Sequence, residues 1–492
     1  MGTETELKLS LAEADIPLLL KNPLLATPPK RQKLYNTYFD TPTLELTKQK
    51  VAVRERRVLR KTLLTVKTAH NSQGGISQRS EWEAPTTPGQ FDFATLIDDA
   101  HLAEALSQKA SELVPVFTTD FSRRIWTLNF RRATIEVALD LGSIIVAREE
   151  IKREQPICEL ELELKQGNPA TLFALARMLS RDVRLHPADD SKAARGYALF
   201  LQQRLTPCKA ETLNFQSRDT TVSVFQTIAR SCIAQLQANE KGLNAPKNEE
   251  YIHQARVALR RLRTALRLFE EALPVGFAVR WSEAWRDVAQ ELGNARNWDV
   301  FCTEQLPLLD LDLGEHPDLV ALRAFANQKR IGAQETARGC LASKSYSLNI
   351  ISFCEALMSL KDNEESIRGY ATRALKKRHK RFVQGAKLAH TLNAEQRHEV
   401  RIDLKKLRYT LDFFEMLYPK KRVQAFSKAL ESTQELLGHM NDLATAEVLM
   451  AERDPTVVDA PLAWAKGRMS AYLEMLPSAL KPVIKLDAPW DK

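Results

Sequence analysis

Charged residues occupy alternate positions in five short segments of the first 165 residues. Because alternate side chains of a β-strand point to the same face, each segment places its charges on one wall of a sheet and its apolar residues on the other. Charges on an inner wall are costly to bury unless they bind metal, phosphate or each other. One such segment is usually a solvated strand face, but five that mix acids and bases favour a site for metal and phosphate. The segments are Glu4 to Lys8, Val51 to Arg56, Gln78 to Glu83, Ile135 to Asp140 and Cys158 to Leu164.

A chain of 492 residues is longer than one typical core, which predicts two or more domains. No apolar run approaches the length of a membrane span, and the first residues lack the basic and apolar regions of a secretory signal. The six cysteines include no close pair, which argues against a zinc site or a disulfide framework and for reduced thiols. We therefore expect a cytoplasmic protein that has no membrane segment. No glycine-rich phosphate loop is present, so any bound phosphate must be held by side chains.

The period of the apolar pattern changes near Pro207. Before about residue 165 the period is mostly two, with turn residues between the apolar runs, which predicts short antiparallel strands. Residues 91–112 and 169–182 have the pattern of helices, and beyond Pro207 the period is helical to about residue 480. The predicted domains are an α+β domain at residues 1–203, a linker at 204–214 and an all-α domain at 215–488.

The helical half contains an internal repeat. Residues 253–274 and 398–419 are 145 positions apart, and nine of the 22 aligned residues are identical. Leu292-Gly293 and Leu437-Gly438 are separated by the same 145 positions. Two motifs with one offset predict a duplicated helical unit, with repeats at about 215–360 and 361–488.

Each repeat carries a helix with a cationic stripe. Residues 201–492 hold 43 Lys and Arg against 36 Asp and Glu, and residues 368–408 hold 13 against three. Like charges at i, i+4 destabilise a helix, so an unbroken cationic stripe implies an anionic partner. We expect the two stripes to face one another and form one groove for a long polyanion, with a third basic helix on one side. The first stripe is His253, Arg256, Arg260, Arg263 and Arg267; the second is His398, Arg401, Lys405 and Arg408; the third helix adds Arg373, Lys376, Lys377 and Lys380.

The first 200 residues resemble the CYTH family of triphosphate tunnel metalloenzymes. The resemblance rests on Glu4-x-Glu6-x-Lys8, Tyr38-Phe-Asp-Thr41, Arg54-x-Arg56, Lys67 and the run from Ser191 to Tyr197. Residues 215–488 resemble a CHAD domain, a duplicated helical module whose basic helices match the two stripes. The resemblance implies an α+β domain built on an eight-stranded antiparallel β-barrel tunnel, followed by an all-α domain of two duplicated helical bundles.

The resemblance also implies a site inside the barrel. Phosphate ligands would be cations, since guanidinium forks suit phosphate oxygens, and Mg²⁺ or Mn²⁺ would be held by carboxylates. The expected phosphate ligands are Lys8, Arg54, Arg56, Lys67, Arg123 and Lys192. The expected metal ligands are Glu4, Glu6, Asp140, Glu159 and Glu161, with Glu163 as an alternative on the same strand. Expected supporting residues are Arg79, Glu81, Glu83 and Glu136, and Tyr38 is either core packing or a substrate contact.

The implied activity is metal-dependent hydrolysis of inorganic tripolyphosphate to pyrophosphate and phosphate, with long-chain polyphosphate bound by the helical half. The same type of site also supports thiamine triphosphatase and adenylate cyclase activity, so the motif does not fix the substrate. A different class of hypothesis makes the chain a non-catalytic polyphosphate-binding or targeting protein. Nucleic acid is a less favoured partner, because the basic stripes lack interleaved aromatic residues for base stacking. The expected polyphosphate ligands are His253, Arg256, Arg260, Arg263, Arg373, Lys376, Lys380, His398, Arg401, Lys405 and Arg408.

Overall fold

The structure is a computed structural model that describes residues 2–68, 74–148, 151–245, 247–314, 316–389, 391–453 and 458–491. The chain forms two compact units. The first contains residues 1–206 and the segment Ala342–Ser359, and the second contains residues 207–341 and 360–492. No helix in the described ranges is long and apolar enough to cross a membrane.

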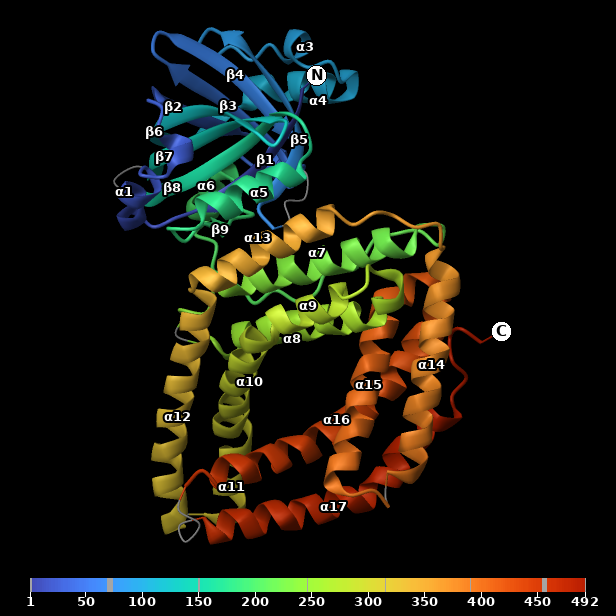
Figure 1. Ribbon diagram of the computed structural model, residues 1–492. Coiled ribbons are helices and arrows are strands. Elements are labelled where there is room, and N and C mark those ends of the chain that lie inside the picture. The colour runs from blue at the N-terminus through green and yellow to red at the C-terminus, as the bar shows by residue number, and fades with distance from the viewer. Residues whose placement is uncertain are drawn as a thin grey trace. The chain divides into compact units, whose positions relative to one another are not determined.

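An antiparallel barrel forms the body of the first unit (Figure 1). Within the described ranges eight strands lie in the order β5-β4-β3-β2-β6-β7-β8-β1, and pairing of β5 with β1 closes the ring. The expectation of an eight-stranded barrel is thus confirmed, and all five charged segments lie on its strands. The strands are β1 (Gly2–Ser10), β2 (Lys30–Asp40), β3 (Val51–Val58), β4 (Lys61–Thr68), β5 (Ile76–Thr86), β6 (Val114–Phe130), β7 (Ala133–Arg148) and β8 (Ile151–Gln166). A short strand, β9 (His186–Pro187), adds to β1.

Helices pack on the barrel through two apolar cores. One lies beneath the short helices on β3 and β4 and includes Leu46, Val53, Val66 and Phe93, all buried. The helices of this unit are α1 (Ile16–Leu19), α2 (Glu45–Lys48), α3 (Phe93–Leu96), α4 (Ala100–Lys109), α5 (Ala170–Leu179), α6 (Lys192–Phe200) and α13 (Lys344–Met358). The 3-10 turns are η1 (Glu13–Asp15), η2 (Pro23–Leu25) and η3 (Ala110–Glu112).

The second core fixes helix α6 against the barrel. Tyr197 of α6 meets Phe117 of β6 edge-on, and Phe117 stacks on Tyr38 of β2 with ring centroids 4.5 Å apart. A Cβ on Gly196 would lie 2.1 Å from the Phe117 ring, so only glycine permits this close approach. The contact sets where the N-terminus of α6, and therefore Lys192, meets the strands.

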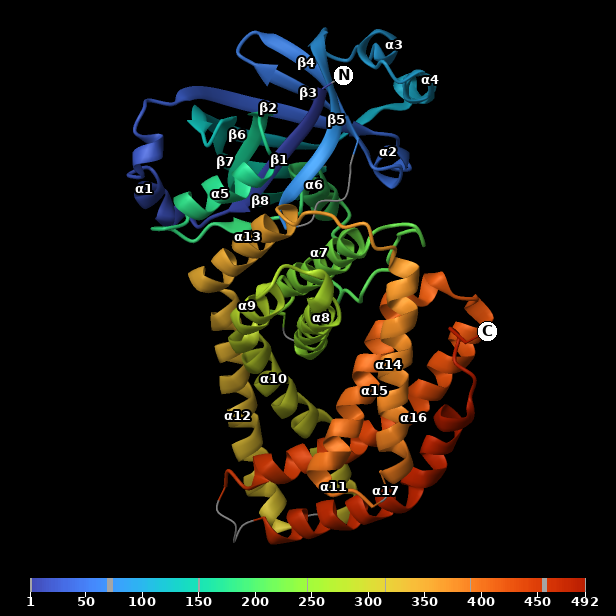
Figure 2. The same ribbon diagram turned by 45° about the vertical axis from the view of Figure 1, so that its right-hand side comes forward.

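The second unit consists of duplicated helices. Its described elements are α7 (Thr221–Glu240), α8 (Glu249–Leu268), η4 (Glu270–Ala272), α9 (Phe277–Ala284), α10 (Arg286–Val300), the π-helical turn η5 (Phe301–Gln305), α11 (Leu306–Leu313), α12 (Pro317–Leu341), α14 (Ile367–Leu388), α15 (Ala394–Phe414), η6 (Glu415–Leu417), α16 (Lys420–Met450) and α17 (Asp459–Lys485). Helix α8 packs on α7 as α15 packs on α14, and α15 begins 145 residues after α8. Figure 2 shows α14 and α15 side by side.

The two repeats are tied at their first helices by reciprocal backbone hydrogen bonds. The amide of Thr221 donates to the carbonyl of Glu365 at 2.9 Å, and the amide of Ile367 donates to the carbonyl of Asp219 at 2.9 Å. The apolar sides of the striped helices are buried, as expected: Leu259, Leu262, Leu266 and Phe269 in the first, and Leu404, Leu407, Leu411 and Phe414 in the second. Each stripe therefore lies opposite a packed face.

Candidate functional sites in the barrel lumen and in the helical unit

Strand register brings charges from different strands into rows inside the barrel. Lys8 on β1 lies opposite Glu161 on β8, and Asp140 on β7 lies opposite both Glu159 on β8 and Arg123 on β6. Because every second residue points inward, these neighbours share the lumen. Asp140 is fully buried and Glu159 is 3% exposed, so their charges need partners within the protein.

Asp140, Glu159 and Glu161 form a cluster of three carboxylates. One oxygen from each lies within 4.8 Å of the others. Arg123 binds Asp140 through two donors, at 2.7 and 2.6 Å, and Lys192 Nζ lies 2.7 Å from Asp140 and 2.9 Å from Glu161. Lys192 also contacts Glu159. The cluster is therefore held together by cations from β6 and α6.

These contacts keep Glu161 ionised. Burial opposes the charge of Glu161, but Lys192 and Arg123 outweigh it and hold the pKa of that carboxyl well below its usual value. Burial likewise opposes the charge of Lys192, but the three carboxylates raise the pKa of this ammonium above its usual value. Three convergent carboxylates are the oxygen donors that Mg²⁺ and Mn²⁺ prefer, so the residues present fit such an ion.

Glu4 and Glu6 belong to a separate ion-pair group on β1, β4 and β5. Arg79 Nε lies 2.9 Å from a carboxylate oxygen of Glu4, and Nη2 of the same guanidinium lies 2.6 Å from a carboxylate oxygen of Glu6. Lys67 Nζ lies 3.0 Å from Glu4 and 2.8 Å from Glu81. Burial opposes ionisation of Glu4, but Lys67 and Arg79 outweigh it and place its pKa far below the usual range.

Arg54 has buried donors that lack hydrogen-bond partners within the described part of the chain. These are Nε and one terminal nitrogen; the latter lies 3.5 Å from a carboxylate oxygen of Glu81. The other terminal nitrogen donates to the hydroxyl of Tyr38 at 3.4 Å. Arg56 donates to Asn36 at 3.1 Å, and burial together with the charge of Arg54 lowers the pKa of Arg56 to about 10. These unsatisfied N–H groups can donate hydrogen bonds to the oxygens of a further anion.

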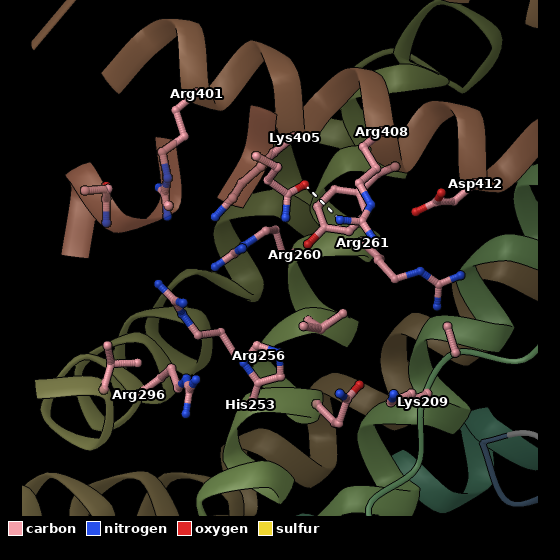
Figure 3. Close-up of a pocket in the computed structure, with 18 of the residues that line it drawn as sticks. Lys209, His253, Arg256, Arg260, Arg261, Arg296, Arg401, Lys405, Arg408 and Asp412 are labelled. Carbon is pink, nitrogen blue, oxygen red and sulfur yellow. Dashed lines mark hydrogen bonds between the residues drawn. The ribbon is translucent and has the colours of Figure 1, made fainter. Parts of the chain in front are cut away.

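The second unit contains a pocket of about 630 Å³ (Figure 3). Its wall is made by α8, α15 and α16, by Arg296 of α10, and by residues 209–213. Figure 3 shows Arg256 and Arg260 of α8 across from Arg401 and Lys405 of α15. The two stripes therefore meet at one site.

None of the ion pairs within 4.0 Å in the described ranges involves Arg256, Arg260, Arg401 or Lys405, four basic residues of the pocket. Burial and the charges of Arg260 and Arg401 lower the pKa of Arg256 to about 9, and burial lowers that of Arg401 to about 10. Burial, Arg260 and Arg401 lower the pKa of Lys405 to about 5. Cations that weaken one another in this way favour a bound polyanion.

Four acidic residues also line the pocket: Glu211, Asp412, Glu415 and Asp442. Asp442 partly offsets the effect of burial on the pKa of Arg401 and of Lys405. Asp412 of α15 lines the pocket at the position where the first repeat has Arg267. Burial raises the pKa of Asp412 to about 6, against the opposing charges of Arg408 and Arg261, while Glu415 and Glu431 add to the rise. The two repeats thus contribute unequally to the pocket.

Comparison with known families agrees with both sites. Residues 2–197 match the CYTH domain family, and residues 227–451 match the CHAD domain family. The chain carries a CYTH domain followed by a CHAD domain. The barrel unit thus contains the CYTH domain, and the pocket lies in the CHAD domain.

Two relatives extend the comparison. The chain is 37% identical over 173 residues to an inorganic triphosphatase of Haemophilus influenzae, an alignment that covers 35% of this chain and 47% of that protein. The match therefore spans about half the length of this curated relative. The CHAD domain from the plant Ricinus communis aligns at 29% identity with a TM-score of 0.51, covering 58% of this chain and 98% of that one.

The structure divides the predicted CYTH site residues into two sets. Asp140, Glu159 and Glu161 converge, whereas Glu4 and Glu6 pair with Arg79 and lie outside that cluster. Glu163 lies 2.6 Å from Lys165, so the ladder on β8 divides between Glu161 and Glu163. The predicted cations Lys8, Arg54, Arg56, Lys67, Arg123 and Lys192 all contact lumen acids. Tyr38 is buried in the core and also contacts Arg54.

The structure also divides the predicted polyphosphate ligands. His253, Arg256, Arg260, Arg401, Lys405 and Arg408 line the pocket; Arg263, Arg373, Lys376, Lys380 and His398 do not. The α14 cations do not form one side of the expected groove, because Leu375 and Phe382 face the core and turn these cations to solvent. Arg373 pairs with Glu365, and Lys376 lies 3.6 Å from Asp491.

Sequence reasoning missed several residues at these sites. Arg195, one turn after Lys192 on α6, contacts Glu159, and its i, i+3 spacing was the available signal. Arg296 lies in the repeated Leu-Gly motif, and Arg261 adjoins the first stripe. Lys209 lies in the predicted linker, whose residues 209–213 line the pocket. A linker assignment gave no reason to expect a binding role there.

The first prediction separates Glu161 from Glu163, which lie on one strand and one face. Glu161→Gln should weaken Mn²⁺ binding by on the order of 10²-fold, because it removes one of three convergent carboxylates. Glu163→Gln is the matched control and should change affinity less than threefold. Calorimetric titration of the full chain with Mn²⁺ gives both values, and equal affinities in the two variants would exclude Glu161 as a ligand.

The second prediction concerns the pH dependence of anion binding in the pocket. As pH falls from 7 to 5, Asp412 loses its negative charge near its pKa of about 6, and Lys405 gains charge near its pKa of about 5. Both changes make the pocket more positive, so affinity for long-chain polyphosphate should rise about tenfold. Calorimetry at each pH measures the change.

Asp412→Asn provides the matched control for this prediction. It should bind more tightly than the native chain at pH 7 and lose most of the rise between pH 7 and pH 6. A pH profile identical to the native one would remove Asp412 from the explanation.

Proposed function

We propose that the CYTH domain hydrolyses inorganic tripolyphosphate to pyrophosphate and phosphate inside the barrel, with Mg²⁺ or Mn²⁺ as cofactor. The observation that carries the proposal is the carboxylate cluster of Asp140, Glu159 and Glu161, bordered by Arg123 and Lys192 in a closed lumen. The similarity to an inorganic triphosphatase supports the choice of substrate. The site combines donors for a divalent cation with donors for phosphate.

The lumen cations bind the substrate by exchanging partners. In the structure Lys67 and Arg123 are neutralised by Glu81 and Asp140. A triphosphate offers several anionic oxygens to the same nitrogens, and the unsatisfied donors of Arg54 add contacts that cost no existing bond. Arginine forks hold two oxygens at once, whereas Lys8, Lys67 and Lys192 act as point charges. Substrate and lumen therefore remain close to charge balance.

The same residues favour the transition state. A divalent cation bound by Asp140, Glu159 and Glu161 would supply charge neutralisation at the phosphate oxygens and an activated water. Arg123 and Lys192 fix the orientation of the three carboxylates through the contacts described above. Arg54 and Arg56 place positive charge where phosphate oxygens gain negative charge as the bond breaks.

Other triphosphate chemistry is the alternative within the same class. Thiamine triphosphatase and adenylate cyclase reactions would use the same phosphate ligands and differ in the group attached to the phosphates. A non-catalytic polyphosphate-binding or targeting protein is the alternative from another class. The cluster of Asp140, Glu159 and Glu161 favours catalysis, because a protein that only binds polyanions gains nothing from buried acids.

We propose further that the CHAD domain binds long-chain polyphosphate in its pocket. The support is a set of half-buried basic residues that take part in none of the described ion pairs: Arg256, Arg260, Arg401 and Lys405. Of the residues that line the pocket, Phe301 and Tyr409 are aromatic, and Phe301 is buried, so the wall offers few rings for base stacking. This favours polyphosphate over nucleic acid.

The third prediction tests the activity. Phosphate release from tripolyphosphate should exceed release from ATP and thiamine triphosphate at least tenfold in kcat/KM, and chelation of divalent cations should abolish it. Release is measured colorimetrically on the purified full chain. Glu161→Gln controls for contaminating phosphatase and should be inactive. Equal release from all three substrates, or full activity in excess chelator, would contradict the proposal.

The fourth prediction compares basic residues inside the pocket with basic residues outside it. Replacing Arg256, Arg260, Arg401 and Lys405 by alanine should weaken polyphosphate binding by on the order of 10³-fold at 50 mM salt, because fewer counter-ions are released. Replacing Arg373, Lys376 and Lys380 by alanine also removes basic side chains, but outside the pocket, and should change affinity less than threefold.

Affinity should be measured on the full chain by titration with long-chain polyphosphate over a range of salt. The full chain is needed because Ala342–Ser359 packs with the barrel unit, so the helical region is not a self-contained fragment. Equal loss of binding in the two variants would show that general surface charge, not the pocket, holds the polyanion.

A further inference from the structure

Helix α13 leaves the helical unit to pack on the barrel. It comes from the chain between α12 and α14, yet Ala342–Ser359 belongs to the same compact unit as the strands. Figure 1 shows α13 beside α5 and β9, and both are contacts of this helix. Its buried residues include Tyr346, Ser347 and Ile350. The segment lies within the predicted first helical repeat, at about residues 215–360.

Polar contacts fix α13 in register on the barrel. The hydroxyl of Ser347 lies 3.2 Å from Nε of Arg184 and 3.0 Å from Nδ1 of His186. Tyr346 stacks on the His186 ring with centroids 5.9 Å apart. At the N-terminal end of α13, the ammonium of Lys344 donates to the carbonyl of Arg181 at 2.5 Å. Ser347 is only 1% exposed, so its contacts are shielded from water.

Strand β9, which lies beside α13, and the residue after it are also bonded to the backbone around Lys8. Strand β9 pairs with Leu9 and Ser10 of β1, and the amide of Ala188 donates to the carbonyl of Lys8 at 2.9 Å. On its other side, the amide of Lys8 donates to the carbonyl of Gly75 at 2.9 Å. Both hydrogen bonds set where the Lys8 side chain enters the lumen.

Helix α13 also contacts the turn that ends at Gly75. A Cβ on Gly74 would lie 2.5 Å from Sγ of Cys354, so α13 packs directly on that turn. The amide of Gly75 donates to a carboxylate oxygen of Asp189 at 2.8 Å, which joins the turn to the segment after β9. Helix α13 thus contacts the chain on both sides of Lys8.

The same segment leads to the second lumen cation. Ser191 follows Asp189 by two residues and caps α6 by accepting from the amide of Ala194 at 3.0 Å. Lys192 is the first residue of α6, and its ammonium contacts Asp140 and Glu161. The chain from β9 to Lys192 is short, so a displacement of β9 would be transmitted to this side chain.

We infer that α13 is a positioning element of the lumen site, in which Ser347, through His186 and β9, fixes Lys8 and Lys192 for phosphate binding. The role in substrate binding rests on the proposed function, whereas the effect on backbone order does not. Neither serine nor histidine touches the substrate, so both are positioning residues. The barrel therefore depends on a helix encoded about 150 residues beyond Lys192.

The fifth prediction uses a matched pair of serines on α13 in the full chain. Ser347→Ala should raise hydrogen exchange about tenfold or more at the amides of Lys8 and Ala188, with no change in the β6–β7 ladder. It should also raise the KM for tripolyphosphate three- to tenfold with a smaller change in kcat. Ser345→Ala is the control, since Ser345 is exposed, and should change neither quantity.

A second variant separates positioning from general packing. His186→Phe keeps a ring against Tyr346 but removes Nδ1, so it should reproduce the part of the Ser347→Ala effect that comes from the Ser347–His186 contact. Ser347→Ala also loses the Arg184 contact, so the double variant should match Ser347→Ala and fall short of the sum of the two single effects. Additive effects, or a lower melting temperature with exchange and KM unchanged, would reduce α13 to a packing helix and overturn the inference. Hydrogen exchange needs no substrate, so failure of the triphosphatase assay alone would count against the proposed activity and not against this contact.

Discussion

The pairing of acids with bases inside the barrel is the interaction on which the lumen depends. Removing one partner of a buried pair leaves an uncompensated charge that costs about 3–5 kcal/mol. Here the pairs interlock: Lys192 serves three carboxylates, and Arg79 serves two. An interlocked network is stable only when the strands keep their register, since a slip by one residue would turn every charge outward. The closed barrel supplies that constraint, because each of the eight strands β1 to β8 pairs with a neighbour on both sides.

The two sites differ in how their basic side chains are neutralised. In the lumen each cation has an acid nearby, so an entering anion must compete for it, and a divalent ion can take the released carboxylates. In the CHAD pocket none of the described ion pairs involves Arg256, Arg260 or Lys405. Burial, followed by repulsion from Arg260, Arg401 and Arg256, lowers the pKa of Lys405 to about 5. The apolar faces of α8 and α15 offset that repulsion through buried residues such as Leu262 and Leu407. The first arrangement suits turnover, and the second suits retention of a polyanion.

The sequence predicts the strands, the lumen face and the duplication well, because each follows from a local period. The alternation at Glu159, Glu161 and Glu163 could only belong to a strand with one charged face. It could not show that Glu161 of β8 meets Asp140 of β7 while Glu163 pairs with Lys165 of its own strand, since the choice depends on how β7 and β8 are aligned. The same limit explains why the orientation of the α14 cations could not be predicted from the sequence. Their charge is evident in the sequence, but the face of α14 that packs inward is decided by tertiary contacts of Leu375 and Phe382.

Helix α13 shows why sequence domains and compact units differ. Its helical period matches that of its neighbours in the chain, so no local signal separates it from the CHAD repeat. Its partners are polar and distant: His186 lies 161 positions before Ser347, and Arg177 lies 178 positions before Glu355. The chain leaves the helical unit at Leu341 and returns at Leu360, so the path from the first repeat to the second runs through the barrel unit. The contacts of α13 are therefore contacts within the barrel unit, whereas the two repeats are joined directly by the backbone hydrogen bonds of Thr221 and Ile367. A segment between two repeats in the sequence can belong to another unit because the repeats keep their own connection to each other.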